Sequence, residues 1–258
     1  MEPFFSVVIP VYNSAGTVEQ VIQRVTQFFH EHNRDYELIL VNDGSRDKSW
    51  DILSRFASEN ARIFAIDLAR NYGQQQAVFC GLEKSRGDYV LTLDDDLQNP
   101  PEEMIRLIEK IQEGYDLVFG RFRVKKHSPF RRLGSLIIRT LSKWMYGKPR
   151  ELALSNFRIF RKDLVGQMIS HPVKRPYIQG LALRFSKNCT DVWVDHQARE
   201  AGTSRYGFYQ FARTLTELIL TYLSFRFPSR GKVSPYTIKR TTESFHDASC
   251  TGPIHHSV

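Results

Sequence analysis

Cysteine is scarce in this chain, which has only three among its 258 residues: Cys80, Cys189 and Cys250. They are odd in number and widely spaced, and no Cys-x-x-Cys pair or Cys/His ligand spacing accompanies them. This pattern argues against both a disulfide framework and a structural zinc site. A reducing compartment is the simpler expectation.

No hydrophobic run is long enough for a predicted membrane span. A spanning helix needs about 20 mostly apolar residues, and the longest candidate, residues 208–227, is interrupted by Arg213 and Glu217. The first residues also lack the basic region and apolar stretch of a signal peptide, so we predict a cytoplasmic protein. The amphipathic helix expected at 208–227, flanked by basic residues, either packs on its own domain or lies peripherally on the cytoplasmic face of an anionic membrane. The sequence leaves both open.

A glycine-rich turn is missing after the first predicted strand. Dinucleotide-dependent oxidoreductases need a G-x-G-x-x-G pattern at this point, where the backbone approaches the pyrophosphate. The chain has Pro10-Val11-Tyr12-Asn13-Ser-Ala-Gly instead. This absence excludes that class of enzyme.

Acidic residues are in the minority, because 28 Asp and Glu stand against 36 Lys and Arg and leave a formal net charge of +8. A surplus of this size favours polyanionic partners, such as nucleic acid, an anionic membrane or phosphorylated substrates. No recognised nucleic-acid-binding motif is present, and basic residues fall around the phosphate site described below. We therefore expect no nucleic-acid partner, while a homo-oligomer stays open.

The sequence does contain a regular alternation of strand and helix patterns. Apolar runs predict strands at residues 6–11, 37–41, 62–67, 89–93 and 117–119, with helix-period segments between them. Repeated units of this kind predict an α/β fold, a Rossmann-like, mixed but mainly parallel sheet flanked by helices. Beyond about residue 121 the alternation stops. There we predict helices at 133–146 and 208–225, strands at 156–160 and near 190–194, and a polar, flexible tail at 228–258.

Polar motifs follow each of the first four predicted strands. They are Pro10-Val-Tyr12-Asn13, Asn42-Asp43-Gly44-Ser45, Arg70-Asn71-Tyr72-Gly73 and Asp94-Asp95-Asp96-Leu97-Gln98. Ligands of open α/β sheets bind beyond the carboxyl ends of the strands. The co-location of these motifs therefore predicts a site at this edge of the sheet.

The acidic run Asp94-Asp95-Asp96 carries the sharpest chemical signal. Adjacent carboxylates repel one another and are costly to bury without a counter-charge. A divalent cation removes this cost, and Mg²⁺ or Mn²⁺ usually binds through one or two carboxylates together with substrate phosphates. The structural alternative is a solvated acidic turn before the helix at Pro101. The position directly after an apolar strand favours a metal site.

The other motifs have plain structural explanations when each is taken alone. Asp43 lies in an Asp-Gly-Ser sequence, which is common turn chemistry, and Asn71 and Gly73 can simply shape a loop. Arg70 can either neutralise a phosphate or pair with Asp67. Only in combination do these motifs favour a functional site.

The four motifs occur in the order Ser6-Val-Val-Ile-Pro-Val-Tyr-Asn13, Val41-Asn-Asp-Gly-Ser45, Arg70-Asn-Tyr-Gly73 and Asp94-Asp-Asp-Leu-Gln-Asn-Pro-Pro-Glu102. Together they closely resemble family 2 glycosyltransferases, which have a GT-A fold. Within that family the pattern looks most like the polyprenyl-phosphate glycosyltransferases, which include dolichol-phosphate mannose synthase and the bacterial undecaprenyl-phosphate sugar transferases. The resemblance covers about residues 6–227. It implies a nucleotide-sugar half at about 1–120, an acceptor half at about 121–207, and the amphipathic helix at 208–227.

The resemblance also implies roles for individual residues. The nucleotide would be held by Pro10, Tyr12, Asn13, Asp43, Asn71, Gly73 and Asp95. A Mg²⁺ or Mn²⁺ ion on the diphosphate would be bound by Asp94, Asp96 and Gln98. The segment Arg199-x-x-Gly-x-Ser-Arg205-Tyr206 is similar to the family's Arg-x-x-Gly-x-Ser-Lys-Tyr, so Arg199 and Arg205 would meet phosphates and, with Asp94 and Asp96, form the catalytic set. The alternative for the two arginines is a solvated basic loop.

The reaction implied is an inverting transfer from a nucleotide-sugar donor, as in cell-envelope biosynthesis. Many family members place an Asp or Glu just before the strand predicted at 156–160, whereas this chain has Ser155-Asn156, with Glu151 as the nearest upstream acid. A hydroxyl acceptor needs a general base, but a lipid phosphate is already ionised and needs none. The missing acid favours a polyprenyl phosphate or other lipid-linked acceptor. Transfer to a sugar hydroxyl with Glu151 as the base, poor turnover, and a non-catalytic nucleotide-sugar binder stay open.

Overall fold

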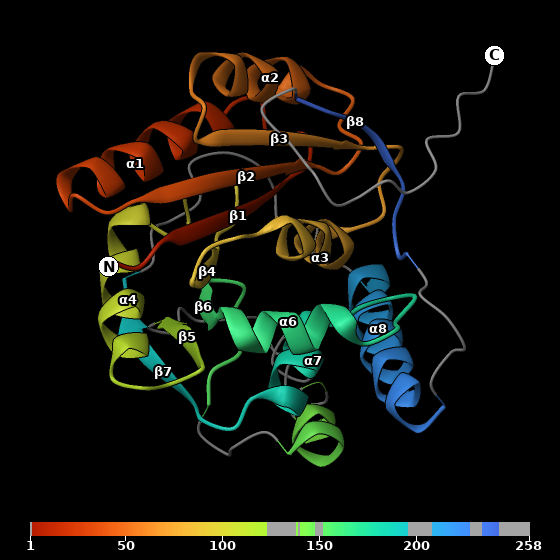
Figure 1. Ribbon diagram of the computed structural model, residues 1–258. Coiled ribbons are helices and arrows are strands. Elements are labelled where there is room, and N and C mark those ends of the chain that lie inside the picture. The colour runs from red at the N-terminus through yellow and green to blue at the C-terminus, as the bar shows by residue number, and fades with distance from the viewer. Residues whose placement is uncertain are drawn as a thin grey trace.

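The computed structural model describes residues 2–122, 138, 140–147, 152–195, 208–227 and 234–242. These residues form one eight-stranded sheet in the order β7-β5-β6-β4-β1-β2-β3-β8 (Figure 1). Its strands are β1 (Phe5–Val11), β2 (Tyr36–Asn42), β3 (Ile63–Leu68), β4 (Tyr89–Thr92), β5 (Leu117–Phe122), β6 (Arg158–Arg161), β7 (Cys189–Val194) and β8 (Ile238–Thr241).

The sheet is mainly parallel, as the alternation of strand and helix patterns predicted. Strand β1 pairs in parallel with β2 and β4, β2 with β3, and β5 with β7. Two strands run the other way: β6 lies antiparallel between β4 and β5, and β8 lies antiparallel along β3. Because β1 to β4 share one direction, the polar motifs that follow them meet at one edge.

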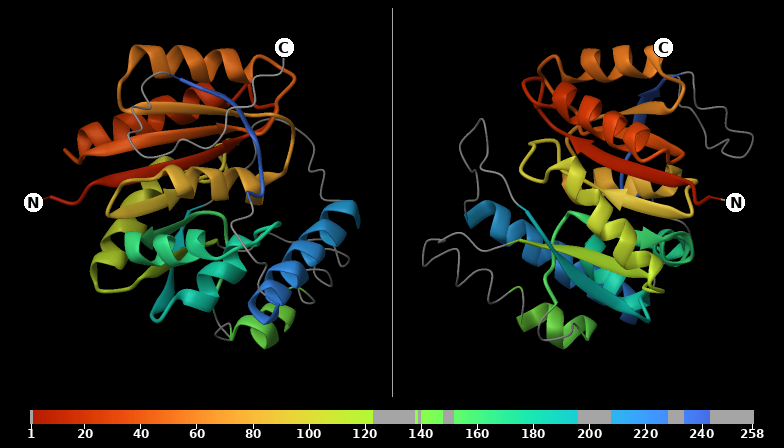
Figure 2. Two further views of the ribbon diagram at one scale, coloured as in Figure 1. Left: turned by 45° about the vertical axis from the view of Figure 1, so that its right-hand side comes forward. Right: turned by 90° about the vertical axis from the view of Figure 1, so that its left-hand side faces the viewer.

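Helices cover both faces of the sheet (Figure 2). One face packs against α1 (Val18–Glu31), α2 (Ser49–Glu59) and α4 (Met104–Gln112), the last preceded by the 3-10 turn η1 (Pro101–Glu103). The other face packs against α3 (Gln74–Lys84), α6 (Lys162–Ser170), α7 (Ile178–Phe185) and α8 (Phe208–Arg226). Residues 140–146 are also helical.

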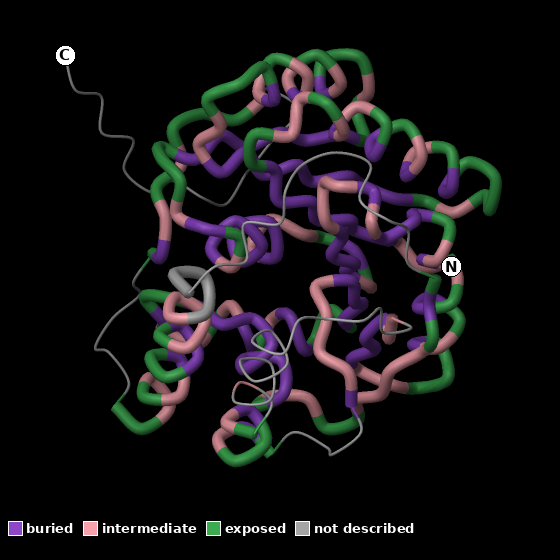
Figure 3. Tube along the Cα trace, turned by 180° about the vertical axis from the view of Figure 1, so that it is seen from behind, coloured by how far each residue is buried: buried purple, intermediate pink, exposed green. Residues whose placement is uncertain are grey.

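The apolar strands are continuous because both of their faces are buried. Val7 and Ile9 of β1 point into the core beneath α1, whereas Val8 between them packs in the core beneath α3. Alternate residues of a strand point to opposite faces, so a strand covered on both sides must be apolar at every position. Figure 3 shows this core, with the buried strands inside and exposed residues on the outer faces of the helices.

Three elements differ from the sequence-based expectations. Helices α6 and α7 were not predicted, and neither was β8, which lies inside the tail expected to be flexible. Helix α2 starts at Ser49, whose N–H and hydroxyl both donate to Oδ1 of Asp47, at 3.0 and 2.6 Å. Strand β8 has no alternating pattern because only Ile238 is half-buried and its other residues are exposed. Its place is decided by pairing with β3.

None of the helices in the described ranges combines the length and the hydropathy that a bilayer crossing requires.

Candidate functional site

The acidic run after β4 is joined to the loop after β1 by Asp95. Its Oδ2 accepts hydrogen bonds from the N–H of Tyr12, at 3.1 Å, and from the hydroxyl of Ser14, at 2.5 Å. Its carbonyl accepts from the hydroxyl of Thr17 at 2.7 Å. Burial is the main reason why the pKa of Asp95 rises to about 6, against the lowering effect of these hydrogen bonds. Asp95 therefore faces the protein and fixes the position of Tyr12.

Asp94 is surrounded by side-chain amides. Its Oδ1 accepts from Nε2 of Gln74 at 2.5 Å, and its Oδ2 accepts from Nδ2 of Asn99 at 3.4 Å. The amide of Asn156 adds a further hydrogen bond. Burial, with a smaller contribution from the neighbouring carboxylates of Asp96 and Asp95, raises the pKa of Asp94 to about 7 against the lowering effect of the Arg158 cation and Asn156. A positive ion beside Asp94 would reverse this penalty.

Asp96 immediately precedes a residue with a positive backbone φ. The next residue, Leu97, has a φ of +58°, and Oδ1 of Asp96 accepts the N–H of Gln98 at 3.2 Å. A positive φ is uncommon outside glycine and is costly for a branched side chain. Leu97 itself is buried.

The acidic run suits a hard divalent cation by its chemistry. Asp94 and Asp96 offer carboxylate oxygens, and the charge of Asp96 contributes to the raised pKa of Asp94. No group of three or more His, Cys, Asp and Glu side chains is arranged to hold a metal within the described ranges. Mg²⁺ or Mn²⁺ usually binds through one or two carboxylates together with substrate phosphates and water.

A wall of buried polar residues behind Asp94 was missed by the sequence analysis. Arg158 of β6 is fully buried, and its Nη1 donates to the carbonyl of Ser155 at 3.3 Å. Burial lowers the pKa of Arg158 to about 10, although Asp94 acts to raise it. Gln179 of α7 donates to Oδ1 of Asn156 at 3.1 Å. An arginine inside an apolar strand was the available signal, since a buried charge needs a partner.

Two buried acceptors near Asp94 have no hydrogen-bond partner among the described residues. They are Oδ1 of Asn99 and Oε1 of Gln179. Both residues belong to the polar surroundings of Asp94, directly or through Asn156. Unsatisfied buried acceptors are rare and indicate a missing polar ligand, an ion or water. The site is therefore prepared for polar groups beyond those of the protein.

Asp43 holds the loop between β3 and α3. It is buried, and its Oδ1 and Oδ2 accept the N–H groups of Tyr72 and Gly73 at 2.7 and 2.8 Å. Burial raises its pKa to about 6, while these hydrogen bonds and the Arg213 cation lower it. The neighbouring Gly44 has a φ of +66°, and a Cβ there would lie 2.5 Å from the backbone carbon of Arg70. Asp43 and Gly44 thus fix two neighbouring motifs in contact.

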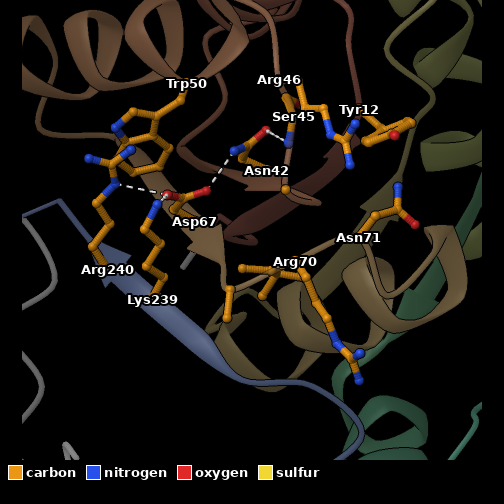
Figure 4. Close-up of a pocket in the computed structure, with 13 residues that line it drawn as sticks. Tyr12, Asn42, Ser45, Arg46, Trp50, Asp67, Arg70, Asn71, Lys239 and Arg240 are labelled. Carbon is orange, nitrogen blue, oxygen red and sulfur yellow. Dashed lines mark hydrogen bonds and ion pairs between the residues drawn. The ribbon is translucent and has the colours of Figure 1, made fainter. Parts of the chain in front are cut away.

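A pocket of about 310 Å³ opens beside these motifs (Figure 4). It is lined by Tyr12 and Asn71 of the predicted site and, from outside that prediction, by Trp50, Asp67, Lys239 and Arg240 among others. Asp67 pairs with Nδ2 of Asn42 at 2.6 Å and with Nε of Arg240 at 2.8 Å. The Arg240 guanidinium lies 4.3 Å from the Trp50 ring centre. Strand β8 therefore brings two cations to a pocket built by β2 and β3.

Arg70 also lines this pocket, and its guanidinium lies 4.9 Å from the centre of the Tyr72 ring. The ion pairs of Asp67 run to Lys239 and Arg240, at 3.8 and 2.8 Å, rather than to Arg70. Of the two alternatives for Arg70, this leaves its charge available to an anion in the pocket.

The remaining predicted residues fall into three groups. Pro10 is buried in β1 opposite Val41. Asn13, with a φ of +52°, donates its N–H to Oγ of Ser45 at 3.0 Å and accepts from the N–H of Arg46 at 2.8 Å. Gln98 is half-buried beside the acidic run. Arg199, Arg205 and the upstream acid Glu151 lie outside the described residues.

Comparison with known proteins agrees with this geometry. The family model for "Glycosyl transferase family 2" matches residues 6–182. The undecaprenyl-phosphate 4-deoxy-4-formamido-L-arabinose transferase of Shewanella sediminis is 36% identical over 217 residues, covering 84% of this chain and 66% of that protein. The enzyme of the same name from Pseudomonas savastanoi pv. phaseolicola is 38% identical over 221 residues, covering 84% and 64%. The chain spans less than two thirds of the length of these relatives.

Solved structures of glucosyl-3-phosphoglycerate synthase from Mycobacterium tuberculosis share the fold. The complex with Mn²⁺, UDP and phosphoglyceric acid has a TM-score of 0.64 at 20% identity, covering 92% of this chain and 86% of that one. The complex with Mg²⁺ and UDP has the same TM-score and coverage at 19% identity. The predicted GT-A architecture is confirmed by this similarity. Since the family model also matches more than half of its residues, this chain belongs to glycosyl transferase family 2.

Proposed function

We propose that this protein is a metal-dependent, inverting glycosyltransferase that moves a sugar from a nucleotide-sugar donor to a polyprenyl phosphate. The observation that carries the proposal is the acidic run, where Asp94 is opposed by the buried Arg158 cation and Asp95 binds the N–H of Tyr12, a residue that lines the cation-rich pocket. Carboxylates next to cations match a nucleoside diphosphate that binds through a metal. The named relatives of this chain, which are undecaprenyl-phosphate sugar transferases, support the acceptor.

The donor nucleoside would lie along the ends of β1, β2 and β3. Tyr12, Asn71 and the pocket cations would contact it directly, whereas Pro10 and Asn13 shape the first loop. Asp43 and Gly73 would act by holding the loop that carries Asn71. Asp95 would act through Tyr12, whose N–H it holds. Asp43 and Asp95 are thus proposed mainly as positioning residues.

The diphosphate would be held at the acidic run. We assign Asp94, Asp96 and Gln98 to a Mg²⁺ or Mn²⁺ ion, which would neutralise phosphate charge as the bond from sugar to phosphate breaks. Arg199 and Arg205 would meet the same phosphates. Interactions that strengthen as the leaving group gains charge stabilise the transition state more than the bound donor. The Arg158 cation opposes the rise in the pKa of Asp94, and a bound divalent ion would lower that pKa further and keep the carboxylate ionised.

The acceptor side supports a phosphate nucleophile. Asn156 stands where a base is expected, and its amide bonds to Asp94 and Gln179. An amide cannot accept a proton at neutral pH, so a hydroxyl acceptor would not be activated there. A lipid phosphate is already ionised and can attack the anomeric carbon from the face opposite the leaving diphosphate. The anomeric configuration would be inverted.

An anionic membrane is the proposed partner surface for the lipid acceptor. Leu220 and Leu223 of α8 are each 40% exposed, and Trp144 and Phe227 are each 76% exposed. The ring of Trp144 lies 6.2 Å from that of Tyr222, so the helix at 140–146 adjoins α8. Exposed Lys143 and Arg226 flank these residues. Apolar side chains beside basic ones suit the interface of an anionic bilayer.

The proposal is tested by assaying transfer from UDP-, GDP- and dTDP-sugars with Mn²⁺, with and without undecaprenyl phosphate. We expect lipid-dependent product with at least one donor, and loss of product with EDTA. Absence of both transfer and hydrolysis with every donor would refute the enzyme proposal. Product formed with a sugar hydroxyl but not with the lipid phosphate would overturn the acceptor.

Asn156→Asp sharpens the acceptor test. A new carboxylate beside Asp94 should raise the pKa of Asp94 further and lower transfer to the lipid phosphate on the order of tenfold. Asn156→Ser is the matched control without the charge. A gain of transfer to a hydroxyl acceptor in Asn156→Asp alone would show that only the missing base had prevented it.

Membrane binding is tested separately by co-sedimentation with vesicles that contain anionic phosphatidylglycerol. We expect the Leu220→Ser, Leu223→Ser double variant to bind less than the wild type. Ser186→Ala serves as a control, because Ser186 lies at the C-terminal end of α7 and is not part of the proposed membrane surface. Equal binding of wild type and double variant would contradict the proposed surface.

A further inference from the structure

The loop between β3 and α3 is held from two sides. From the sheet, the carboxylate of Asp43 accepts the N–H groups of Tyr72 and Gly73. From the opposite side, Nη2 of Arg213 in α8 donates to the carbonyl of Tyr72. Arg213 follows Tyr72 by 141 residues in the chain. One peptide of the loop is thus bound through its carbonyl by a distant helix and through its neighbouring amides by the sheet.

The Arg213 guanidinium packs directly against Gly73. Its φ is +105°, and a Cβ built there would lie 1.5 Å from Nη2 and 2.4 Å from Cζ of Arg213. No other residue type combines this backbone conformation with so close an approach. The positive φ requires the glycine of the Arg70-Asn-Tyr-Gly73 motif, and the Arg213 guanidinium of α8 packs against it.

Arg213 is itself fixed by its own helix and by α3. Its Nε donates to Oε1 of Glu217, one turn later, at 3.1 Å. Glu217 is buried at 4% exposure and also accepts a hydrogen bond from the side chain of Gln76 in α3. An arginine whose planar fork reaches two acceptors in a buried setting has little freedom to move. Arg213 therefore forms a rigid link between α8 and the loop.

We propose that Arg213 is a positioning residue for the donor site, through which α8 holds the loop that carries Asn71 and lines the nucleotide pocket. The inference rests on the proposed function for the identity of the ligand. Asp43 binds the N–H groups of Tyr72 and Gly73, and Arg213 binds the carbonyl of Tyr72 between them. Because such coupling is reciprocal, donor binding should also hold α8 in place against the sheet. Helix α8 therefore belongs to the donor site as well as to the proposed membrane face.

The test compares Arg213→Ala with wild type in the full chain, by calorimetric titration of UDP and GDP with Mn²⁺. We expect the dissociation constant of whichever nucleotide binds to rise about tenfold or more, since a charge-assisted hydrogen bond is lost. In the transfer assay the donor KM should rise, while the lipid-phosphate KM stays within twofold. Arg55→Ala is the matched control, because Arg55 pairs with Glu19 on the exposed surface. A dissociation constant for Arg213→Ala within twofold of wild type would overturn the inference.

Further variants keep the test valid if Arg213→Ala does not fold. Arg213→Lys keeps the charge but reaches only one acceptor, so it should fall between wild type and Arg213→Ala. Gly73→Ala should weaken nucleotide binding at least as much as Arg213→Ala does, because the positive φ of Gly73 adds backbone strain to the lost contact. The double variant should bind no more weakly than Gly73→Ala alone, because that substitution has already displaced Arg213. Fully multiplicative losses would contradict a shared contact.

Hydrogen exchange separates this inference from the proposed function. The amides of Tyr72 and Gly73 should exchange at least tenfold faster in Arg213→Ala than in wild type, with no nucleotide present. If wild type binds no nucleotide, the proposed function fails and this measurement alone decides the role of Arg213. Unchanged exchange at residues 72–73 would then show that Arg213 does not hold the loop.

Discussion

The two halves of the sheet present their polar residues in different ways. In the half formed by β1 to β4, every motif follows the end of a strand and lies in a loop. In the other half, Arg158 lies inside a strand, Gln179 inside α7 and Arg213 inside α8. Loop residues can be recognised from their position in the sequence. Residues inside an apolar element are recognised only through the partner that the fold brings to them.

The two halves also differ in charge, and the difference makes them complementary. The first supplies carboxylates whose pKa is raised, namely Asp43, Asp94 and Asp95. The second supplies the cations that oppose this rise, Arg158 toward Asp94 and Arg213 toward Asp43. Neither set would be stable in a buried place alone. The site therefore lies at the junction of the halves and depends on both.

The largest effect is expected at the acidic run, which belongs to the first half alone. Asp96→Asn should lower kcat for transfer on the order of 100- to 1000-fold, because charge on the leaving diphosphate loses its stabilisation. The measurement is steady-state transfer with saturating Mn²⁺. Asp51→Asn, an exposed change in the first turn of α2, is the control. Full metal-dependent activity in Asp96→Asn would remove Asp96 from the site.

A glycine pair then compares a loop of the site with a helix of the second half. Gly44→Ala should weaken nucleotide binding about tenfold and cost about 1–3 kcal/mol of stability, because its φ is +66° and its Cβ meets the Arg70 backbone. Gly166→Ala in α6 meets no atom within 4 Å and should leave binding unchanged. Calorimetry and thermal melting measure both. Equal behaviour of the two variants would contradict the tight contact between the second and third motifs.

The pH dependence of stability reports whether the second half supplies enough positive charge. The pKa of Asp94 is raised from 3.8 to about 7, so the folded state binds its proton more tightly than the unfolded state. Without metal, this group favours folding below pH about 4, and its contribution is lost as pH rises through 7. The loss is on the order of 2 kcal/mol after solvent screening. Melting of metal-free protein from pH 4 to 8 should show it.

Asp94→Asn is the comparison for that experiment. The neutral side chain should remove this part of the pH dependence, and saturating Mn²⁺ should offset it in wild type. A wild-type profile that is identical to that of Asp94→Asn would mean that Arg158 and the surrounding amides already compensate the carboxylate.

The smallest effect is expected at β8, which extends the first half from the far end of the chain. Arg240→Ala should weaken nucleotide binding about threefold to tenfold, since the guanidinium bonds to Asp67 and stacks on Trp50 at the pocket. Lys187→Ala, an exposed change between α7 and β7, is the control. Titration with UDP and GDP measures the change. If Arg240→Ala binds each nucleotide as tightly as the wild type does, the nucleotide lies away from β8.

The sequence was sufficient for the parallel core of the fold. Strands such as β1 are continuously apolar, and α1 repeats its apolar residues with helical spacing, because each is buried by neighbours on fixed faces. Helices α6 and α7 escaped prediction because they are short, with nine and eight residues. Strand β8 escaped because an exposed edge strand needs no apolar pattern. These elements are stabilised by contacts that are distant in sequence.

By itself, the sequence determined that carboxylates and loop motifs meet at one edge of a parallel sheet, since strand direction alone brings them there. Only the tertiary structure decided which residues oppose their charge. Arg158, Arg213 and Arg240 come from β6, α8 and β8, and the carboxylates that they oppose, Asp94, Asp43 and Asp67, lie in the first half. A local pattern records the burial of an element and the direction of its chain. The partner of a buried charge depends on packing between remote segments, which no local pattern records.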